Sequence, residues 1–217
     1  MKEGDAMNIF IIGANGRVAQ ELTKRLVTAG HTVYAGVRDL AKVQKSQQVK
    51  PVPFNLQDAV EDLDEKLKGM DAVYFLAGSR GKDLLQTNAF GAVKSMQAAE
   101  QVGVKRYILL SSLFATQPEK WNQPGLNQLT NYNIAKFFAD NHLINQTKLD
   151  YTIVQPGGLA EEAGTGLVDF APEKVGRNPI SDVAEVLEKL VQYPNTKYKA
   201  IQMLSGTEPI DAGMAKL

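Results

Sequence analysis

The sequence predicts an α/β fold with a doubly wound, mostly parallel sheet of about seven strands and helices on both faces. Short apolar runs rich in β-branched and aromatic residues recur along the 217 residues. Their apolarity is continuous rather than alternating, which is typical of strands that are buried on both faces. Amphipathic helical patterns separate the runs, and this alternation favours right-handed crossovers within one sheet.

Seven apolar runs are predicted to be strands, and the segments between them contain helices. The predicted strands are residues 8–12, 32–37, 51–54, 72–77, 106–110, 151–154 and 200–204. One apolar helix face, which ends before Gly30, consists of Val18, Leu22, Leu26 and Ala29. A second, which ends before Gly103, consists of Leu85, Ala89, Ala92, Met96 and Ala99. Ser181 and Asp182 precede the last long helical pattern and are predicted to cap it.

The length and the 44% of hydrophobic residues are sufficient for one well-buried domain, which we expect to span residues 1–217. Two irregular segments, 113–131 and 157–180, each follow a predicted strand. They should therefore lie at the carboxyl edge of the sheet, where open α/β folds bind ligands. Only about 60 residues follow the sixth strand, so we expect a small substrate region and a small-molecule substrate.

The composition excludes several classes of function. Lys and Arg together number 24, as do Asp and Glu, so nothing favours nucleic acid or an acidic membrane surface as a partner. The absence of cysteine and the presence of only two histidines argue against disulfides and a metal site. The first residues lack the apolar core of a signal peptide, and no apolar run approaches ~20 residues. We therefore expect a cytoplasmic protein; the oligomeric state is unknown from the sequence.

The junction between the first strand and the first helix has the pattern G-x-x-G-x-x-A, formed by Gly13, Gly16 and Ala19. In a strand, loop and helix, this pattern allows a pyrophosphate to lie against backbone N–H groups at the helix N-terminus. The alternative is a tight connection that needs a positive φ angle. The bare spacing is weak evidence, because Gly78 and Gly81 repeat it without this context. Its position after the first strand strengthens the prediction of dinucleotide binding.

Arg38 lies at the end of the second predicted strand, 22 positions after Gly16. Dinucleotide folds meet the adenosine ribose there, with an acid for a free 2′-hydroxyl or an arginine for a 2′-phosphate. Arg17 in the glycine loop also suits a phosphate. These residues favour NADP(H) over NAD(H). Alternatively, Arg38 is an ordinary surface residue, and Asp39 either caps the helix that starts at Leu40 or binds the ribose.

Tyr132 and Lys136 are four residues apart on a predicted helix, so they share a face. An ammonium beside a phenol is expected to lower the phenol pKa from its reference value of about 10. This pair therefore indicates acid catalysis of carbonyl reduction. Tyr193 and Lys197 share the spacing, but Pro194 places them in a turn.

Other polar residues near the predicted site have both functional and structural interpretations. Ser111 and Ser112 end the fifth strand and can polarise a substrate carbonyl or cap a turn. Asn88 can hold a water molecule, fix the lysine or act as a satisfied core amide. Trp121 can stack on a flat substrate, although packing at the edge of the cleft is the simpler interpretation.

Several of these segments together resemble the short-chain dehydrogenase/reductase superfamily. They are GANGRVA (13–19), VRD (37–39), TNAFGAVKSMQAAEQVGVKRYILLSS (87–112), YNIAK (132–136) and LDYTIVQPGGL (149–159). More narrowly, the chain resembles the compact atypical members, which are NmrA-like and flavin- or biliverdin-reductase-like NAD(P)-binding proteins. The resemblance covers nearly the whole chain and implies a Rossmann-like domain.

The resemblance implies a role for each matching residue. Tyr132 would be the general acid, Lys136 its tuner and a ribose ligand, Ser112 or Ser111 the carbonyl polariser, and Asn88 a supporting amide. The implied cofactor contacts are Gly13, Asn15, Gly16, Arg17 and Val18 in the loop, Arg38 at the 2′-phosphate, Asn55 and Leu56 beside adenine, Ala77 and Gly78 along the cofactor, and Pro156 and Gly157 at the nicotinamide. The 20-residue interval from Ser112 to Tyr132 is longer than in the main branch of the superfamily.

The sequence thus predicts an NADP(H)-dependent oxidoreductase that transfers a hydride to or from a small carbonyl, quinone or flavin-like substrate. Atypical relatives often keep the cofactor site and lose the active-site residues. A non-catalytic NADP(H)-sensing regulatory protein is therefore one alternative, against which Tyr132 and Lys136 argue. An NAD(P)-dependent epimerase or dehydratase is another.

Overall fold

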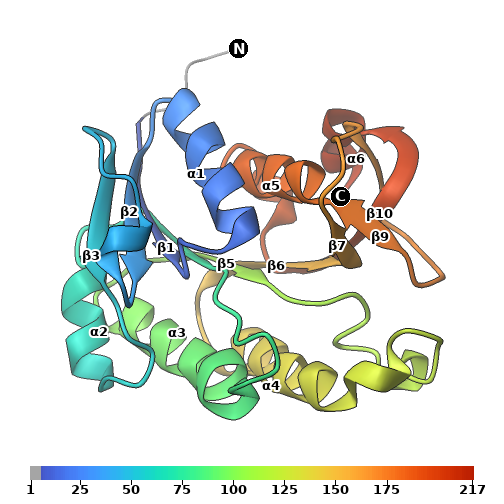
Figure 1. The fold of residues 1–217 in the computed structure, drawn as a ribbon, viewed down its shortest axis with the longest axis horizontal. Coiled ribbons are helices and arrows are strands. Elements are labelled where there is room, and N and C mark those ends of the chain that lie inside the picture. Colours follow the sequence, from blue (N-terminus) through green and yellow to red (C-terminus); the bar gives the residue numbers. More distant parts are fainter. Residues whose placement is uncertain (1–5) are drawn as a thin grey trace.

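The computed structural model describes residues 6–217 and has an eight-stranded sheet at its centre (Figure 1). Its strands are β1 (Asn8–Ile12), β2 (Thr32–Val37), β3 (Val49–Pro53), β4 (Ala72–Phe75), β5 (Arg106–Leu110), β6 (Asp150–Pro156), β8 (Leu167–Asp169) and β10 (Lys199–Pro209). The opening MKEGD, on which part of the signal-peptide argument depends, lies outside the described residues.

The order of the strands is β3-β2-β1-β4-β5-β6-β10-β8. All neighbouring pairs are parallel except β10 and β8, which are antiparallel. The order reverses at β1, because β2 and β3 lie on one side of it and β4 on the other. This confirms the predicted doubly wound, Rossmann-like fold. Ligands bind such sheets at the carboxyl ends of the strands beside this switch point.

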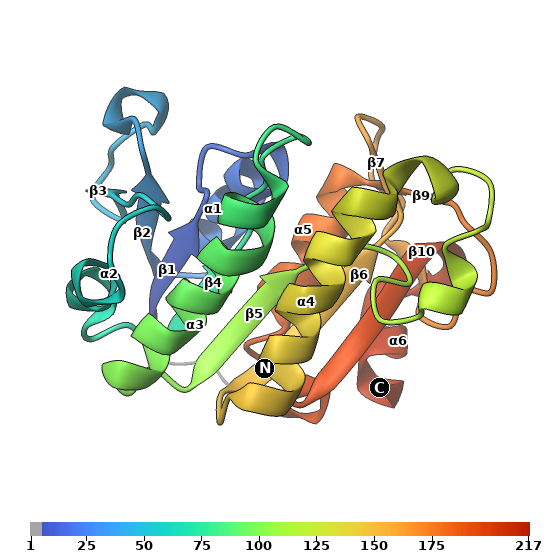
Figure 2. The same cartoon turned by 90° about the horizontal axis from the view of Figure 1, so that it is seen from below.

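Helices cover both faces of the sheet (Figures 1 and 2). On one face lie α1 (Arg17–Thr28), α5 (Ile180–Lys189) and α6 (Ile210–Lys216). On the other lie α2 (Val60–Leu67), α3 (Gly91–Gln101) and α4 (Thr130–Gln146). Strand side chains alternate between the two layers: Ile9 and Ile11 of β1 pack with α1 and α5, whereas Phe10 and Ile12 pack with α2 and α3. Burial on both faces explains the continuous apolarity of the strand sequences.

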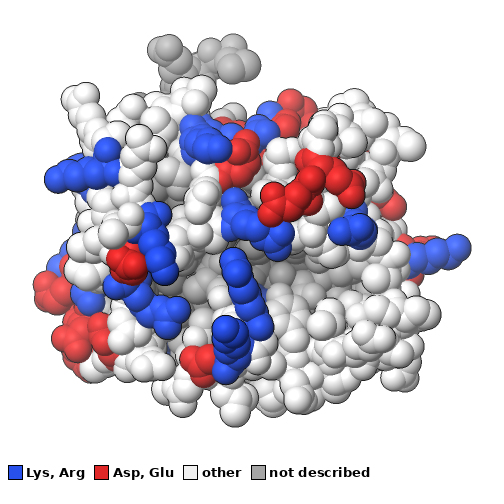
Figure 3. All heavy atoms as spheres, in the orientation of Figure 1, with Lys and Arg blue, Asp and Glu red and all other residues white. Residues whose placement is uncertain are grey.

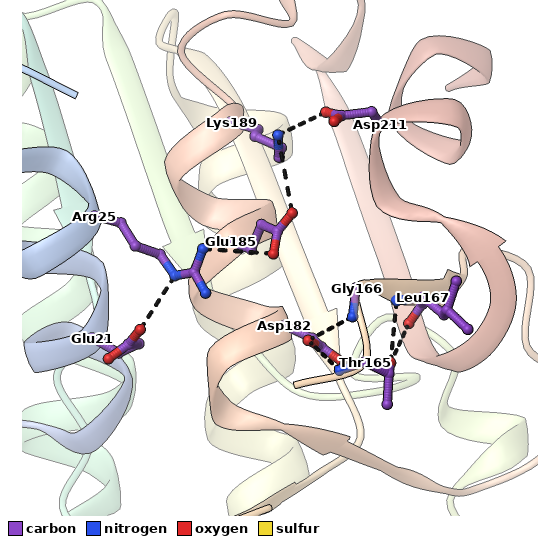
Figure 4. Close-up of polar contacts among 9 residues, drawn as sticks. All are labelled: Glu21, Arg25, Thr165, Gly166, Leu167, Asp182, Glu185, Lys189 and Asp211. Carbon is purple, nitrogen blue, oxygen red and sulfur yellow. Dashed lines mark hydrogen bonds and ion pairs between the residues drawn. The ribbon is translucent and has the colours of Figure 1, made fainter. Parts of the chain in front are cut away.

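Polar contacts join the exposed sides of α1, α5 and α6 (Figure 4). Arg25 of α1 lies 3.4 Å from Glu21 and 3.5 Å from Glu185 of α5. Lys189 of α5 lies 2.8 Å from Asp211 of α6. Ion pairs at protein surfaces contribute only about 0–1 kcal/mol each. The apolar layer beneath therefore holds these helices on the sheet.

Two details of the predicted helices are wrong. Leu85, which the pattern places on a buried face, is 71% exposed, and Ala29 is exposed at the C-terminus of α1. The segment Leu84–Phe90 before α3 is a π-helix. Its hydrogen bonds span five residues instead of four, so the apolar periodicity of α3 does not extend back into it. The buried face starts at Gly91 and Ala92.

The two irregular segments have limited regular structure. Segment 113–131 contains the 3₁₀ turns Pro118–Lys120 and Asn127–Leu129. Segment 157–180 contains β8 and a small parallel sheet of β7 (Gly158–Ala160) and β9 (Arg177–Pro179). Among residues 6–217, no helix has both the length and the apolar character needed to cross a bilayer.

Candidate active site and dinucleotide cleft

Gly13 makes the turn that joins β1 to the glycine loop. Its φ is +84°, and a Cβ atom there would lie 2.6 Å from the Cα of Ala77, which follows β4. The N–H of Gly13 donates to the carbonyl of Gly36 in β2 at 3.0 Å, and that of Gly16 donates to the carbonyl of Gly13. Both glycines therefore allow a close approach of backbone, while their own N–H groups are already used.

The free donors at the glycine loop are the first N–H groups of α1, which have no partner within the helix. No side chain caps them, and no acidic residue lies in the first turn. The Val18 side chain is buried in the core, so only its backbone faces this end, whereas Asn15 and Arg17 are exposed. The positive end of the helix dipole is thus open to an anion such as a pyrophosphate.

Arg17 forms an ion pair with Glu161, which follows β7, at 3.0 Å. The segment after Glu161 is tethered by the buried Asp182 of α5, which accepts hydrogen bonds from the Thr165 N–H, the Thr165 hydroxyl and the Gly166 N–H (Figure 4). Asp182 therefore anchors this loop instead of capping α5, which already begins at Ile180. The sequence gives no sign of either contact.

On the prediction that Arg17 binds a phosphate of a dinucleotide, replacement Glu161→Gln is expected to strengthen dinucleotide binding by up to about fivefold, because an exposed carboxylate then no longer competes for Arg17. Isothermal titration of both proteins at low salt measures the change. Glu162→Gln removes the same charge from the neighbouring exposed residue, so it is the matched control. Equal gains in both variants would show that only net charge matters.

The end of β2 borders a pocket of about 220 Å³ lined by Arg38, Pro53, Phe54, Asn55, Asp58 and Lys66. Arg38 is exposed and forms no ion pair within the described part of the chain. Asp39 accepts a hydrogen bond from the Ala41 N–H and pairs with Lys42 at 3.7 Å. The carboxylate thus caps the following turn, which was one of the two alternatives for it, and the guanidinium stays available.

Asn55 lines this pocket, whereas the neighbouring Leu56 is not among its lining residues. The Asn55 side chain donates to Asp58 at 3.0 Å and accepts from the Gln57 N–H at 3.2 Å. Its polar atoms therefore shape the local turn. Leu56 packs against the start of α3, where a Cβ atom on Gly91 would be 3.0 Å from it. Both residues remain predicted contacts for adenine through their position at the end of β3.

Asn88 lies in the π-helix and is 1% exposed. Its Oδ1 accepts from the Ser79 N–H at 3.1 Å, while its Nδ2 is buried and has no hydrogen-bond partner among residues 6–217. Nδ2 lies 4.0 Å from the position of a Cβ atom on Gly78. A buried donor without an acceptor costs about 1–3 kcal/mol. Because Nδ2 lies beside Gly78, it is positioned to donate a hydrogen bond to a ligand at the end of β4.

Tyr132 and Lys136 lie on one face of α4, with the Lys136 Nζ 5.8 Å from the centre of the Tyr132 ring. Nζ donates to the Leu110 carbonyl at 2.8 Å. Burial lowers the pKa of Lys136 to about 8, although Asp140 acts in the opposite direction. Burial, with a contribution from Asp140, raises the pKa of Tyr132 to about 12. The expected lowering of the phenol pKa is therefore wrong for this arrangement, because desolvation dominates.

The two serines at the end of β5 have different surroundings. Ser111 is buried and donates to Asp140 at 2.8 Å. Ser112 is half-buried, and its hydroxyl forms no hydrogen bond with the described residues. Of the two candidates, Ser112 has the hydroxyl that is free for a ligand. Trp121 donates to the Phe114 carbonyl at 2.9 Å and packs edge-on against Phe137, as the simpler interpretation expects.

Pro156 ends β6 and Gly157 follows it, at the same edge of the sheet. The Gly157 N–H donates to Asn178 Oδ1 at 2.9 Å, and a Cβ atom on Gly157 would be 2.3 Å from the Gly176 carbonyl oxygen. The backbone here is packed against the segment that leads to β9. Asn178 Nδ2 is buried and has no partner. Asn178 is therefore a polar group at the predicted nicotinamide end that sequence reasoning missed.

The predicted site residues thus lie along the carboxyl edge of one sheet, at the ends of β1, β2, β3, β4, β5 and β6. Figure 3 shows a hollow in the middle of this face, with Lys and Arg side chains along its border. An open helix N-terminus, a free arginine at the end of β2 and an unpartnered donor at the end of β4 fit a dinucleotide. The individual contacts stay predictions.

Residues 13–194 match the family described as NAD(P)H-binding. The chain belongs to this family. Membership confirms the predicted NAD(P)-binding character and the resemblance to atypical short-chain dehydrogenases/reductases.

The named relatives of the chain include a protein called an epimerase and a protein called an oxidoreductase. It is 34% identical to the "uncharacterized sugar epimerase YhfK" of Bacillus subtilis, over 97% of this chain and 100% of that protein. It is 33% identical to the UPF0659 protein YMR090W of Saccharomyces cerevisiae, over 94% of this chain and 96% of that one. The crystal structure of the oxidoreductase ylbE from Lactococcus lactis is 45% identical, with a TM-score of 0.94 over 97% of this chain and 96% of that one.

Besides Asn178, sequence reasoning missed three polar residues around the predicted site, and two of these three left a signal in the sequence. Asp140 continues the four-residue spacing of Tyr132 and Lys136 by one more turn, and Gln155 is a polar residue inside an apolar strand. Glu161 left no signal, because its partner is 144 positions away in the sequence.

Proposed function

We propose that the protein is an NADP(H)-dependent oxidoreductase that transfers a hydride to or from a small carbonyl, quinone or flavin-like substrate. The observation that carries the proposal is that the open N-terminus of α1 and the pair Tyr132 and Lys136 lie at the same edge of the sheet. A binding loop alone would support a nucleotide sensor. A buried lysine beside a phenol adds a means of proton transfer.

The residues that would hold the dinucleotide follow from their positions at the ends of the strands. The first turn of α1 and Arg17 would bind the pyrophosphate. Arg38 would bind the 2′-phosphate beside adenine, because a guanidinium matches phosphate geometry. Asn88 Nδ2 and the Gly78 backbone would lie along the cofactor, and Pro156 and Gly157 would border the nicotinamide.

When bound, the nicotinamide would supply or accept the hydride. The chain's own residues would manage the proton and the developing charge. With its pKa raised to about 12, the Tyr132 phenol keeps its proton at neutral pH and can donate it to a carbonyl oxygen. The Ser112 hydroxyl would donate a hydrogen bond to the same oxygen. Lys136, when charged, would favour the phenolate left after donation.

The preference for NADP(H) depends on Arg38. We expect wild type to bind NADPH more tightly than NADH, and Arg38→Ala to weaken NADPH binding by about tenfold or more, because a charge-assisted hydrogen bond contributes about 1.5–3 kcal/mol. NADH binding should change little. Fluorescence titration of both nucleotides against both proteins measures this preference.

Lys24→Ala is the control for Arg38→Ala. Lys24 lies on α1, its side chain is 76% exposed, and it is remote from the pocket. Its replacement should leave both affinities unchanged. Equal affinities for NADPH and NADH in wild type would contradict the assignment of the 2′-phosphate site.

A second candidate function is epimerisation, which the name of the Bacillus subtilis relative favours. An epimerase would use the same cleft but would regenerate its bound cofactor without net oxidation. Incubation with nucleotide-linked and free sugars in D₂O, followed by NMR, distinguishes the two. Inversion of a sugar carbon without uptake of deuterium from the solvent, and without a net change in NADPH, would favour the epimerase. Stoichiometric consumption of NADPH with quinones, aldehydes or flavins would favour the reductase.

A further inference from the structure

Asp140 is a buried carboxylate that the proposed proton transfer does not use. It lies on α4 one helical turn after Lys136 and is 0% exposed. Its Oδ2 accepts from the hydroxyl of Ser111, which directly follows β5, at 2.8 Å and from the Gln155 Nε2 of β6 at 2.9 Å. Its Oδ1 has no partner among the described residues. Asp140 thus joins α4, which carries Tyr132, to β6, which carries Pro156, and to the segment after β5, which carries Ser112.

A carboxylate in such a place is costly, because two hydrogen bonds do not replace the hydration of a charged group. Among residues 6–217, the opposite charge that acts on it is that of Lys136, one turn away. Asp140 in turn is the charged group that raises the pKa of Lys136, against the lowering of that pKa by burial. Burial raises the pKa of Asp140 to about 6 and lowers that of Lys136 to about 8.

Within the described part of the chain, Lys136 is the charged group that acts on Asp140. On α4, the titratable neighbours are Tyr132 and Lys136. The segment after β5 contributes Ser111 and β6 contributes Gln155, neither of which titrates in this range. Gln155 also contacts the Thr116 hydroxyl at 3.4 Å. Lys136 and Asp140 are therefore two opposite charges buried one helical turn apart on α4, although no direct ion pair joins them.

We propose that Asp140 is a positioning residue that acts through Lys136, keeping the buried amine in its ammonium form over the pH range in which it serves the nucleotide ribose and Tyr132. The role of Lys136 toward the nucleotide rests on the proposed function. The coupling of the two charges does not, because both belong to this chain. An ammonium that lost this partner would release its proton at a lower pH, because burial would then act unopposed.

The direct test measures the protonation of Lys136 in the free protein by NMR of ¹⁵N- and ¹³C-labelled lysine. Lys136→Met identifies the signal by its absence. In Asp140→Asn, whose side chain has the same shape and can still accept from Ser111 and Gln155, the midpoint should fall by about one pH unit or more. Asp182→Asn changes another buried aspartate, which holds Thr165 and Gly166. It should leave the midpoint in place.

The same variants test the consequence for binding. NADPH affinity of wild type should fall as the pH rises through the Lys136 midpoint, and in Asp140→Asn this fall should move to lower pH by the same interval. A Lys136 midpoint that is unchanged in Asp140→Asn overturns the inference. If wild type binds no NADPH at any pH, the proposed function fails, and the midpoint of Lys136 still decides whether Asp140 sets its charge.

Stability separates this role from a purely structural one. The folded-state pKa of Asp140 lies above its ordinary value of 3.8, so its ionisation opposes folding above about pH 6 and has no effect below about pH 4. Asp140→Asn should therefore unfold at an equal or higher temperature than wild type at pH 7. A large loss of thermal stability without a shift of the Lys136 midpoint would show that Asp140 only joins α4 to the sheet, and would overturn the inference.

Discussion

Replacement Tyr132→Phe is expected to lower kcat by about 10²- to 10⁴-fold, the usual contribution of a positioned proton donor. The ring remains, so the packing of α4 and the position of Lys136 should change little. The hydroxyl is the only atom lost, and NADPH affinity should stay within about twofold of wild type if the phenol acts on the substrate. Consumption of NADPH with quinones, aldehydes and flavins measures the rate.

Tyr193→Phe is the matched control for this prediction. Tyr193 has the same four-residue spacing to a lysine, but its hydroxyl bonds Asp211 of α6 at 3.2 Å, away from the cleft. Its removal should leave the rate unchanged. A rate that survives in Tyr132→Phe would exclude the phenol as the proton donor. No turnover in wild type, with tight NADPH binding, would favour the sensor over the enzyme.

Gly13→Ala is expected to abolish measurable NADPH binding and to lower the free energy of unfolding. A left-handed φ costs a residue with a Cβ atom about 1–2 kcal/mol. The new methyl carbon would also lie 2.6 Å from the Cα of Ala77, and both residues belong to stiff backbone segments. Relief of such an overlap typically costs about 1–3 kcal/mol more. The loop must then shift away from β4, and the shift displaces the first turn of α1.

Gly30→Ala separates these two costs, because Gly30 has a similar φ of +92° and nothing lies within 4 Å of the added Cβ atom. Its free energy of unfolding should fall only by the cost of the left-handed φ, and it should bind NADPH normally. Denaturant unfolding and NADPH titration of both variants make the comparison. Equal destabilisation in the two would show that the contact with Ala77 relaxes freely.

The strands and their direction could be predicted because burial on both faces leaves a local trace. The first, second and fifth strands begin and end at the predicted residues, Asn8–Ile12, Thr32–Val37 and Arg106–Leu110. The antiparallel β8 and the small sheet of β7 and β9 were not predicted. Each is only three residues long, so too few side chains exist to show a period.

The sequence by itself determined that the strand ends share one edge, since parallel strands end on the same side of a sheet, and that Tyr132 and Lys136 share a helix face. Only the tertiary structure decided their electrostatic state. The pKa of Tyr132 depends on how deeply α4 is buried, and that of Lys136 on both this burial and the charge of Asp140. The availability of Arg17 likewise depends on Glu161, a distant residue brought near by folding. Desolvation and long-range contacts arise when separate segments pack together, so no local pattern encodes them.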